Sequence, residues 1–289
     1  MTPEHNDDAA APAQVTLLDG PLGTELEALG VATPLPLWTA AAIRDNPDDV
    51  RAVHALYAAA GADVHTTGTF RTTARALAQA GCPTSWTDLT ELAVSLCRQG
   101  AGADATVAGS IAPLEDCWHP ERTPDLAHLH SEHGAMAQCL ADAGADLLLV
   151  ETMPTERELM AATRAAVSTG LPVWSAITLG PQGDFFSATT VAQAAAVAAG
   201  EGADVFLMNC TPADAITGLI DELAALSDRP RRLGAYGNAL FAGHDGWTPE
   251  QYSAEANRWL TRGATVIGGC CGTGPAHVAS LRCLLNNRS

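Results

Sequence analysis

The chain has 289 residues and a formal net charge of −18, from 33 acidic residues against 15 basic ones, and 47% of its residues are hydrophobic. Every basic residue is arginine, so the sequence excludes a lysine Schiff base and a Walker-type phosphate loop, which both need a lysine amine. The negative charge argues against nucleic acid or an anionic membrane as the main partner, because either would repel the chain.

The opening segment, residues 1–14, is acidic and rich in proline and alanine, and it lacks the basic and apolar regions of a secretory signal. We predict a disordered tail there and one folded domain over residues 15–289. No stretch approaches 18 uninterrupted apolar residues, so we expect no membrane span. Without a signal, the eight cysteines are expected to lie in a reducing cytoplasm, where thiols stay free, bind metal or catalyse.

One pattern recurs along the chain: an alanine-rich stretch ends at glycine, a small residue and often aspartate follow, and a short apolar run comes next. Glycine can end a helix in the left-handed conformation, and a continuous apolar run is typical of a strand buried on both faces. The runs with this introduction begin at Gly61, Gly102, Gly144, Gly202 and Gly263. Three further runs have strand character without it and begin at Val15, Pro172 and Arg231.

These eight predicted strands are separated by stretches with a helical spacing of apolar residues, such as 48–60 and 156–167. Alternating strands and helices predict a parallel sheet, and eight such units favour a single-domain (β/α)8 barrel of the TIM type. A doubly wound open sheet is the alternative fold. It would normally carry a G-x-G-x-x-G fingerprint after its first strand, and the segment DGPLGTEL at 19–26 lacks that spacing.

Three cysteines fall at the carboxyl ends of predicted strands, where a barrel of this kind carries its chemistry. Cys210 follows the sixth strand, and Cys270 and Cys271 follow the eighth, so the three thiols can converge above the strand between them. Three thiolates leave one tetrahedral position of a zinc ion open, as in catalytic sites. Neighbouring cysteines reach one ion only through a sharp turn, for which the glycines of GGCCGTG at 268–274 give the freedom. The alternative is that all three are ordinary buried thiols.

The other cysteines and the histidines carry weaker signals. Cys117 lies in a predicted loop and is assigned no role. The histidines at 128–133 are predicted to lie at a solvated helix start, and His277 is predicted to cap or pack after the cysteine turn. We interpret as ordinary buried thiols, on helices or at their ends, Cys82, Cys97, Cys139 and Cys283.

A zinc ion with three thiolate ligands suits a soft fourth ligand such as a substrate thiol, and it activates water poorly because its ligands are negative. Coordination lets that thiol lose its proton near neutral pH, which gives a thiolate nucleophile at a fixed place. The reaction that these properties favour is attack of sulfur on an activated carbon, with the protein positioning the partners and excluding water.

At these residues the chain resembles the homocysteine S-methyltransferase family. The blocks occur in the family's order, and the last is the most specific because it joins the cysteine pair to a Gly-Thr-x-Pro-x-His turn. The matching blocks are LLDGPLGTEL at 17–26, AGADVHTTGTF at 60–70, AGSIAP at 108–113, ADLLLVET at 145–152, NC at 209–210 and GGCCGTGPAHVASLR at 268–282. The resemblance implies a (β/α)8 barrel, in agreement with the strand count.

The resemblance also implies a site. It implies that the three cysteines bind Zn2+, which holds the sulfur of homocysteine, and that Asp19, Gly20 and Glu151 seat the amino-acid end of this substrate. A glutamate can pair with the ammonium group, and a glycine amide can be approached closely. The alternatives are a helix cap for Asp19 and a solvated loop charge for Glu151. Thr67 either lines the pocket or caps a turn, and Asn238 is a further pocket candidate.

The resemblance predicts transfer of a methyl group to homocysteine, giving methionine. Members that use methyltetrahydrofolate through cobalamin carry further modules, and one barrel occupies these residues, so we expect a small onium donor. S-methylmethionine and S-adenosylmethionine are favoured, and betaine is the alternative. Aromatic rings that could hold an onium group by cation–π contact are Trp38, Phe70, Trp118 and Tyr236.

Two other functions remain as alternatives: methylation of a different thiol or selenol, and a zinc- or thiol-binding barrel without catalysis. Two departures from the family pattern motivate them. Gly68 replaces a frequent asparagine, and Tyr236-Gly237 replaces a Pro-Asn-x-Gly type of turn after the seventh strand. No oligomeric state is predicted.

Overall fold

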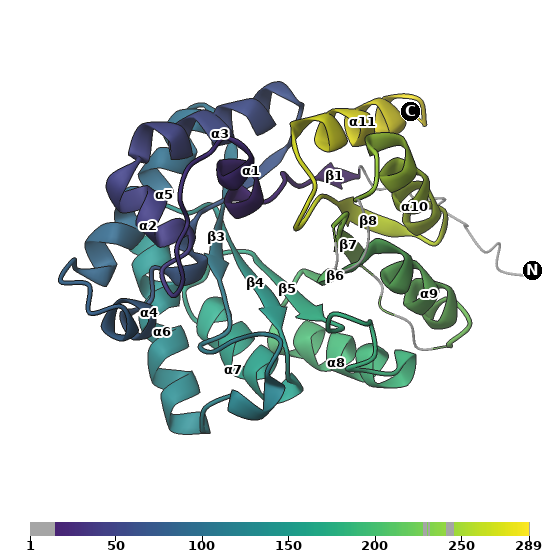
Figure 1. The fold of residues 1–289 in the computed structure, drawn as a ribbon. Coiled ribbons are helices and arrows are strands. Elements are labelled where there is room, and N and C mark those ends of the chain that lie inside the picture. Colours follow the sequence, from purple (N-terminus) through teal and green to yellow (C-terminus); the bar gives the residue numbers. More distant parts are fainter. Residues whose placement is uncertain (1–14, 228–229, 231, 241–245, 289) are drawn as a thin grey trace, which may run out of the picture.

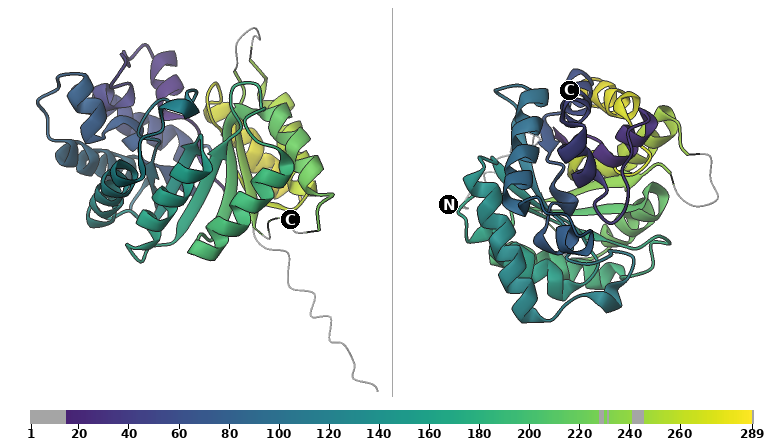
Figure 2. Two further views of the ribbon diagram at one scale, coloured as in Figure 1. Left: turned by 90° about the horizontal axis from the view of Figure 1, so that it is seen from below. Right: turned by 60° about the vertical axis from the view of Figure 1, so that its left-hand side comes forward.

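Eight parallel strands of the described chain form a barrel with helices on its outer side (Figures 1 and 2). The computed structural model describes residues 15–227, 230, 232–240 and 246–288. The strands are β1 (Thr16–Leu17), β2 (Val64–Thr66), β3 (Thr106–Ile111), β4 (Leu147–Met153), β5 (Val173–Thr178), β6 (Val205–Pro212), β7 (Leu233–Asn238) and β8 (Ala264–Ile267).

The strands pair in the order β1-β8-β7-β6-β5-β4-β3-β2. The ring closes between β1 and β2, where Leu18 bridges Val64 and the Asp19 amide donates to the Val64 carbonyl at 3.0 Å. All eight predicted runs therefore supply a strand, and the predicted single-domain (β/α)8 barrel is confirmed.

Helices connect successive strands. The predicted helices at 48–60 and 156–167 correspond to α3 and α7. The helices are α1 (Leu22–Ala28), α2 (Thr39–Asp45), α3 (Pro47–Ala59), α4 (Ala74–Gln79), α5 (Trp86–Ala101), α6 (Leu126–Asp142), α7 (Glu156–Val167), α8 (Ala188–Glu201), α9 (Ala213–Leu223), α10 (Pro249–Thr261) and α11 (Pro275–Asn286), with short 3-10 turns η1 (Thr69–Arg71) and η2 (Pro120–Arg122).

Local sequence explains where many helices begin and end. Thr155 and Ser187 precede α7 and α8, and their hydroxyls accept hydrogen bonds from backbone amides of the first turn, which otherwise have no partner. Gly202 follows α8 with φ of 112°, in the left-handed conformation that ends a helix at low steric cost. The prediction that a glycine ends the helix before the apolar run is therefore confirmed at this position.

Two apolar layers hold the barrel together. Leu18, Leu149 and Leu207 belong to the cluster inside the barrel, whereas Val150 and Met208, the next residues along two of these strands, pack outward against the helices. Side chains alternate between the two layers along each strand. Because both layers are apolar, β4 and β6 are buried over their whole length, which explains their continuous apolar runs.

Some predictions about individual side chains were wrong. His133 lies in the middle of α6, is only 1% exposed and contacts the Glu158 carboxylate, so it is not part of a solvated helix start. Among the four cysteines interpreted as buried, only Cys97 is buried, while Cys283 is exposed. The predicted tail over residues 1–14 lies outside the described residues. No helix within the described ranges combines the length and apolar character needed to cross a membrane.

Candidate functional site

Cys210, Cys270 and Cys271 meet at the carboxyl end of the barrel. Their three Sγ atoms all lie within 4.8 Å of one another, and no other such group of three His, Cys, Asp or Glu side chains occurs in the part of the chain that the structure describes. Three sulfurs bound to one zinc ion would stand about 3.8 Å apart. The thiols therefore fit a shared zinc ion after small side-chain adjustments.

The backbone of Cys210 aims its thiol inward. Its φ is 50°, an uncommon left-handed value for a residue with a side chain, and it lies where the pairing of β6 with β7 shifts register. Thr152 at the end of β4 has a similar φ of 61°. The side chain of Asn209 connects these two positions, because its Oδ1 accepts from the Thr152 amide at 3.0 Å and its Nδ2 donates to the Thr152 hydroxyl at 2.7 Å. This pairing helps to offset the backbone strain.

The turn after β8 presents the other two thiols. The Thr273 hydroxyl donates to the Cys270 carbonyl at 2.8 Å, and the Cys271 carbonyl accepts from the Ala239 amide at 2.9 Å. Gly272 has φ of 79°, and a Cβ there would lie 2.2 Å from the Cβ of Leu240. Glycine is thus required at this point of the turn both for its backbone conformation and for space.

The three thiols differ in acidity. Hydrogen bonds from Cys210 and Cys270 hold the pKa of Cys271 well below its usual value. The pKa of Cys210 is raised, first by the neighbouring Cys117 thiol and then by the other two thiols. The pKa of Cys270 is raised as well, so Cys271 is the thiol of the three that ionises most readily, and a thiolate is the form that ligates zinc.

Glu151 lies at the end of β4 with its carboxylate buried. Ser110 donates to Oε1 at 2.5 Å and Tyr236 donates to Oε2 at 3.1 Å. Burial raises the pKa of Glu151 to about 7, although both hydrogen bonds act in the opposite direction. Glu151 is therefore not a solvated loop charge. Because burial disfavours the ionised form of Glu151, a cation beside it would stabilise the carboxylate.

Asp19 lies after β1 and is also buried. Its two carboxylate oxygens accept from the amide and the hydroxyl of Thr66, each at 2.9 Å. Burial raises the pKa of Asp19 to about 8, the bonds from Thr66 lower it, and the charge of Glu151 raises it further. Asp19 does not cap α1, whose N-cap residue is Pro21 without a side-chain bond.

Gly20 and Thr67 differ in what they offer the site. Gly20 lines the cavity, and a Cβ there would lie 2.6 Å from the ring of Tyr57. Thr67 also lines the cavity, but its hydroxyl already accepts from the Ser110 amide at 3.0 Å and shares a bond with Thr69, so its role is structural as well.

Asn238 and Gly68 bear on two other sequence expectations. Asn238 is buried at the end of β7 and is not among the residues that line the cavity, although its neighbours Gly237 and Ala239 hydrogen-bond to the backbone of Cys270 and Cys271. Its place in the pocket stays a prediction. Gly68 lines the cavity, and a Cβ there would lie 2.5 Å from Leu22 and 3.0 Å from Ile43. An asparagine at position 68 of this chain would therefore require the side chains of Leu22 and Ile43 to shift.

The cavity of about 320 Å³ has a floor of buried and half-buried residues and an open rim. The floor contains the three thiols with Asp19, Glu151 and Tyr236; Asp19 is 2% exposed. The rim is at least partly exposed to solvent, and its Leu35 is 80% exposed. Two of its rings, those of Trp38 and Phe70, meet edge to face with centroids 5.7 Å apart. The rim residues are Leu35, Trp38, Phe70, Arg71, Asp116 and Trp118.

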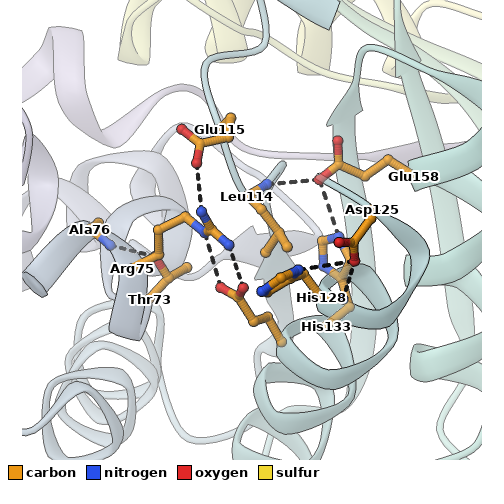
Figure 3. A network of polar contacts seen from close by, with 10 residues as sticks. Thr73, Arg75, Ala76, Leu114, Glu115, Asp125, His128, His133 and Glu158 are labelled. Atoms are coloured by element: carbon orange, nitrogen blue, oxygen red, sulfur yellow. Dashed lines mark hydrogen bonds and ion pairs between the residues drawn. The ribbon is translucent and has the colours of Figure 1, made fainter. Parts of the chain in front are cut away.

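The loop after β3 brings Asp116, Cys117 and Trp118 to the cavity. Figure 3 shows the two groups that anchor this loop, the buried Glu158 and the half-buried Arg75. Glu158 on α7 accepts from the Leu114 amide at 2.8 Å. Arg75 on α4 pairs with carboxylates on this loop and on α6, those of Glu115 at 2.7 Å and Glu132 at 2.5 Å. These contacts join segments far apart in sequence, so sequence reasoning proposed Trp118 of this loop for the site without identifying what anchors the loop there.

Two residues that line the cavity, Cys117 and Tyr236, and one beneath it, Ser110, were missed or given a lesser role by the sequence analysis. Cys117 was assigned no role, yet its thiol is in hydrogen-bonding contact with Cys210. Ser110 stands at a strand end, which was its only signal, and Tyr236 was considered only as an aromatic ring for the donor. His277 agrees with its prediction: its Nδ1 accepts from the Gly274 amide at 3.1 Å, and it packs against the ring of Tyr252.

Comparison with known proteins places these features in a family. The sequence model of the family described as "Homocysteine S-methyltransferase" matches residues 16–285. Homocysteine S-methyltransferase of Escherichia coli K12 is 30% identical over 93% of this chain and 94% of that protein, and homocysteine S-methyltransferase 1 of Zea mays is 28% identical over 94% and 95%. The metallated form of the homocysteine methyltransferase MmuM from Escherichia coli has a TM-score of 0.80 at 27% identity, covering 94% of this chain and 96% of that one.

Proposed function

This chain is a methyltransferase that belongs to the homocysteine S-methyltransferase family, and we propose that it uses zinc and a small onium donor to methylate the thiol of L-homocysteine, giving methionine. The observation that supports this most is the convergence of Cys210, Cys270 and Cys271 at the floor of one cavity. The donors that we favour are S-methylmethionine and S-adenosylmethionine.

The donor set supports zinc as the metal. Thiolates suit a borderline-soft ion such as Zn2+, and three of them leave a position for a substrate sulfur. When bound, zinc supplies a homocysteine thiolate near neutral pH at a fixed place. The solved metallated form of the Escherichia coli relative is consistent with a metal at this site.

The acidic residues of the floor would hold the amino-acid end of homocysteine. Glu151 offers a buried carboxylate to the substrate ammonium, and Tyr236 and Ser110 orient that carboxylate through hydrogen bonds. An ammonium group beside Glu151 favours its charged form, so substrate binding lowers the raised pKa. Gly20 carries no side chain, which lets the substrate approach the backbone beside Asp19.

The transfer itself needs little acid or base chemistry from the protein. A bond forms between the homocysteine sulfur and the donor methyl carbon as the bond from that carbon to the onium atom breaks. The electron pair of the broken bond stays with the onium atom, and the donor leaves as a neutral thioether or amine. The protein therefore contributes by aligning the two substrates in a cavity that excludes most water.

The test is an assay of methylated product with homocysteine, other thiols and a selenol as acceptors against each donor, with metal analysis of the same sample. We expect about one zinc per chain, methionine as the product, and loss of both zinc and turnover in Cys270→Ser. Cys283→Ser, which alters an exposed cysteine on α11, is the control and should keep both. Full activity of Cys270→Ser without zinc would overturn the mechanism, and binding without product would support a non-catalytic barrel.

A further inference from the structure

Arg71 is the one cationic side chain among the described residues that line the cavity. It is the last residue of η1, and its guanidinium carbon lies 5.3 Å from the centre of the Phe70 ring. This stacking holds the guanidinium at the rim, next to the aromatic pair of Trp38 and Phe70. A cation thus stands where the second substrate must enter.

Within the described chain, the guanidinium of Arg71 has no carboxylate within ion-pair distance and no hydrogen-bond acceptor. Most other arginines do have such a partner; Arg75, for example, pairs with both Glu115 and Glu132. A guanidinium carries five N–H donors in a planar fork that matches a carboxylate. These donors of Arg71 are therefore available to a ligand.

The charged groups of the cavity indicate what kind of ligand Arg71 can bind. The other ionisable groups of the cavity, apart from thiols and Tyr236, are the carboxyls of Asp19, Asp116 and Glu151. A cavity that had only to attract an onium group would gain from being acidic throughout, since a cation at the rim repels an onium. A guanidinium there becomes favourable when the onium ligand also carries an anionic group.

The two substrates are expected to bind at opposite ends of the cavity. Homocysteine must reach the thiols at the floor, where Asp19 and Glu151 lie. The donor has to place its methyl group against the homocysteine sulfur from the open side, so the rest of the donor extends toward the rim. The carboxylate that Arg71 can meet is therefore the donor's carboxylate.

We propose that Arg71 binds the carboxylate of the methyl donor. This inference rests on the proposed methyl transfer and adds a residue that recognises the donor. Asp116 suits the ammonium group of the same donor, because one carboxylate oxygen accepts from the Trp118 amide at 2.9 Å and the other has no partner among the described residues.

The experiment measures binding to the zinc-loaded full chain by calorimetry, with two ligands that differ only at the carboxyl group. S-methylmethionine carries the carboxylate, and its carboxamide keeps the sulfonium and the ammonium without the negative charge. We expect the wild-type chain to bind the carboxylate ligand about tenfold or more tightly than the carboxamide, as a charge-assisted bidentate contact predicts. Arg71→Gln should remove this preference, and Arg71→Lys should keep part of it.

Arg122→Gln serves as the matched control, because it removes the same charge from an exposed residue of η2 that does not line the cavity. It should retain the wild-type preference. A preference that persists in Arg71→Gln, or that is absent from the wild-type chain, would overturn the proposal. An effect confined to homocysteine affinity would also overturn it and assign Arg71 to the acceptor.

Turnover separates this inference from the proposed function. If the chain forms methionine and Arg71→Gln raises KM for S-methylmethionine about tenfold with little change in kcat, both hold. If no donor gives methionine, the proposed function fails, while the calorimetric comparison still decides whether Arg71 recognises a carboxylate.

Discussion

The side chain of Asn209 on β6 holds Thr152 on β4 by two hydrogen bonds, one to its amide and one to its hydroxyl. Each of these residues is next to a group of the proposed site, Asn209 to Cys210 and Thr152 to Glu151. Both Thr152 and Cys210 have left-handed backbone conformations, which cost free energy unless the surroundings impose them. Asn209 therefore sets the position of the Cys210 thiol, a proposed metal ligand, relative to the Glu151 carboxylate, the proposed contact of the substrate ammonium.

Replacing this amide should weaken both the fold and the metal site. Asn209→Ala leaves the buried amide and hydroxyl of Thr152 without their partner, so we expect the free energy of unfolding to fall by about 1–3 kcal/mol. Zinc affinity, measured by competition with a chromogenic chelator, should fall by about tenfold or more, because the Cys210 backbone is no longer fixed. Asn286→Ala, at an exposed position of α11, should change neither quantity. Unchanged zinc affinity in Asn209→Ala would contradict the positioning role.

The glycine at position 68 can be tested for steric exclusion of asparagine. Gly68→Asn places a Cβ 2.5 Å from Leu22, and we expect it to lower the free energy of unfolding by about 1–3 kcal/mol through overpacking. Leu22→Ala removes the contacting atoms, so Gly68→Asn should cost less in that background. Urea denaturation of the two single variants and the double variant measures this coupling. Strictly additive costs would show that Leu22 is not what excludes the asparagine.

The fold could be predicted because its signals are local. A glycine in the left-handed conformation ends α8 at Gly202, and the apolar run after it is a strand buried on both faces. The same local order places Cys210 and Cys270 at strand ends, and the closure of a barrel brings strand ends together. The convergence of the thiols was therefore predictable from the positions of the cysteines along the chain.

Contacts between distant segments were not predictable in the same way. His133 is buried because α7 places the Glu158 carboxylate against it, and nothing near His133 in sequence indicates this. Cys117 reaches Cys210 because Arg75 and Glu158 anchor its loop. Burial of polar residues in loops depends on which helices pack over them, and periodicity does not specify that packing.

The buried carboxyls predict how stability depends on pH in the metal-free protein. Burial raises the pKa of Glu151 to about 7 and that of Asp19 to about 8, whereas both groups titrate near pH 4 in an unfolded chain. Between about pH 4 and 8 the folded state therefore holds more protons than the unfolded state, so the free energy of unfolding falls as the pH rises.

The variant Glu151→Gln tests this dependence, because glutamine cannot ionise and can still bond to Ser110 and Tyr236. Urea denaturation of the chelator-treated protein at pH 5 and pH 8.5 should show a smaller loss of stability for Glu151→Gln than for the wild-type chain. Glu222→Gln, on the exposed side of α9, should keep the wild-type loss. A loss as large in Glu151→Gln as in the wild-type chain would mean that Glu151 is not protonated in the folded state at pH 5.

The turn that carries Cys270 and Cys271 needs glycine at position 272, and Gly263 is the matched comparison for the cost of adding a side chain there. Both Gly272 and Gly263 have positive φ, 79° and 96°, but an added Cβ meets Leu240 at 2.2 Å in the first case and nothing within 4 Å in the second. Gly263→Ala should therefore cost only the conformational strain, about 1–2 kcal/mol, and leave zinc affinity unchanged. Gly272→Ala should cost more by urea denaturation and weaken zinc binding about tenfold, because the turn that carries Cys270 and Cys271 has to move. Equal effects of the two substitutions would show that the turn accommodates a side chain and that its geometry does not determine metal affinity.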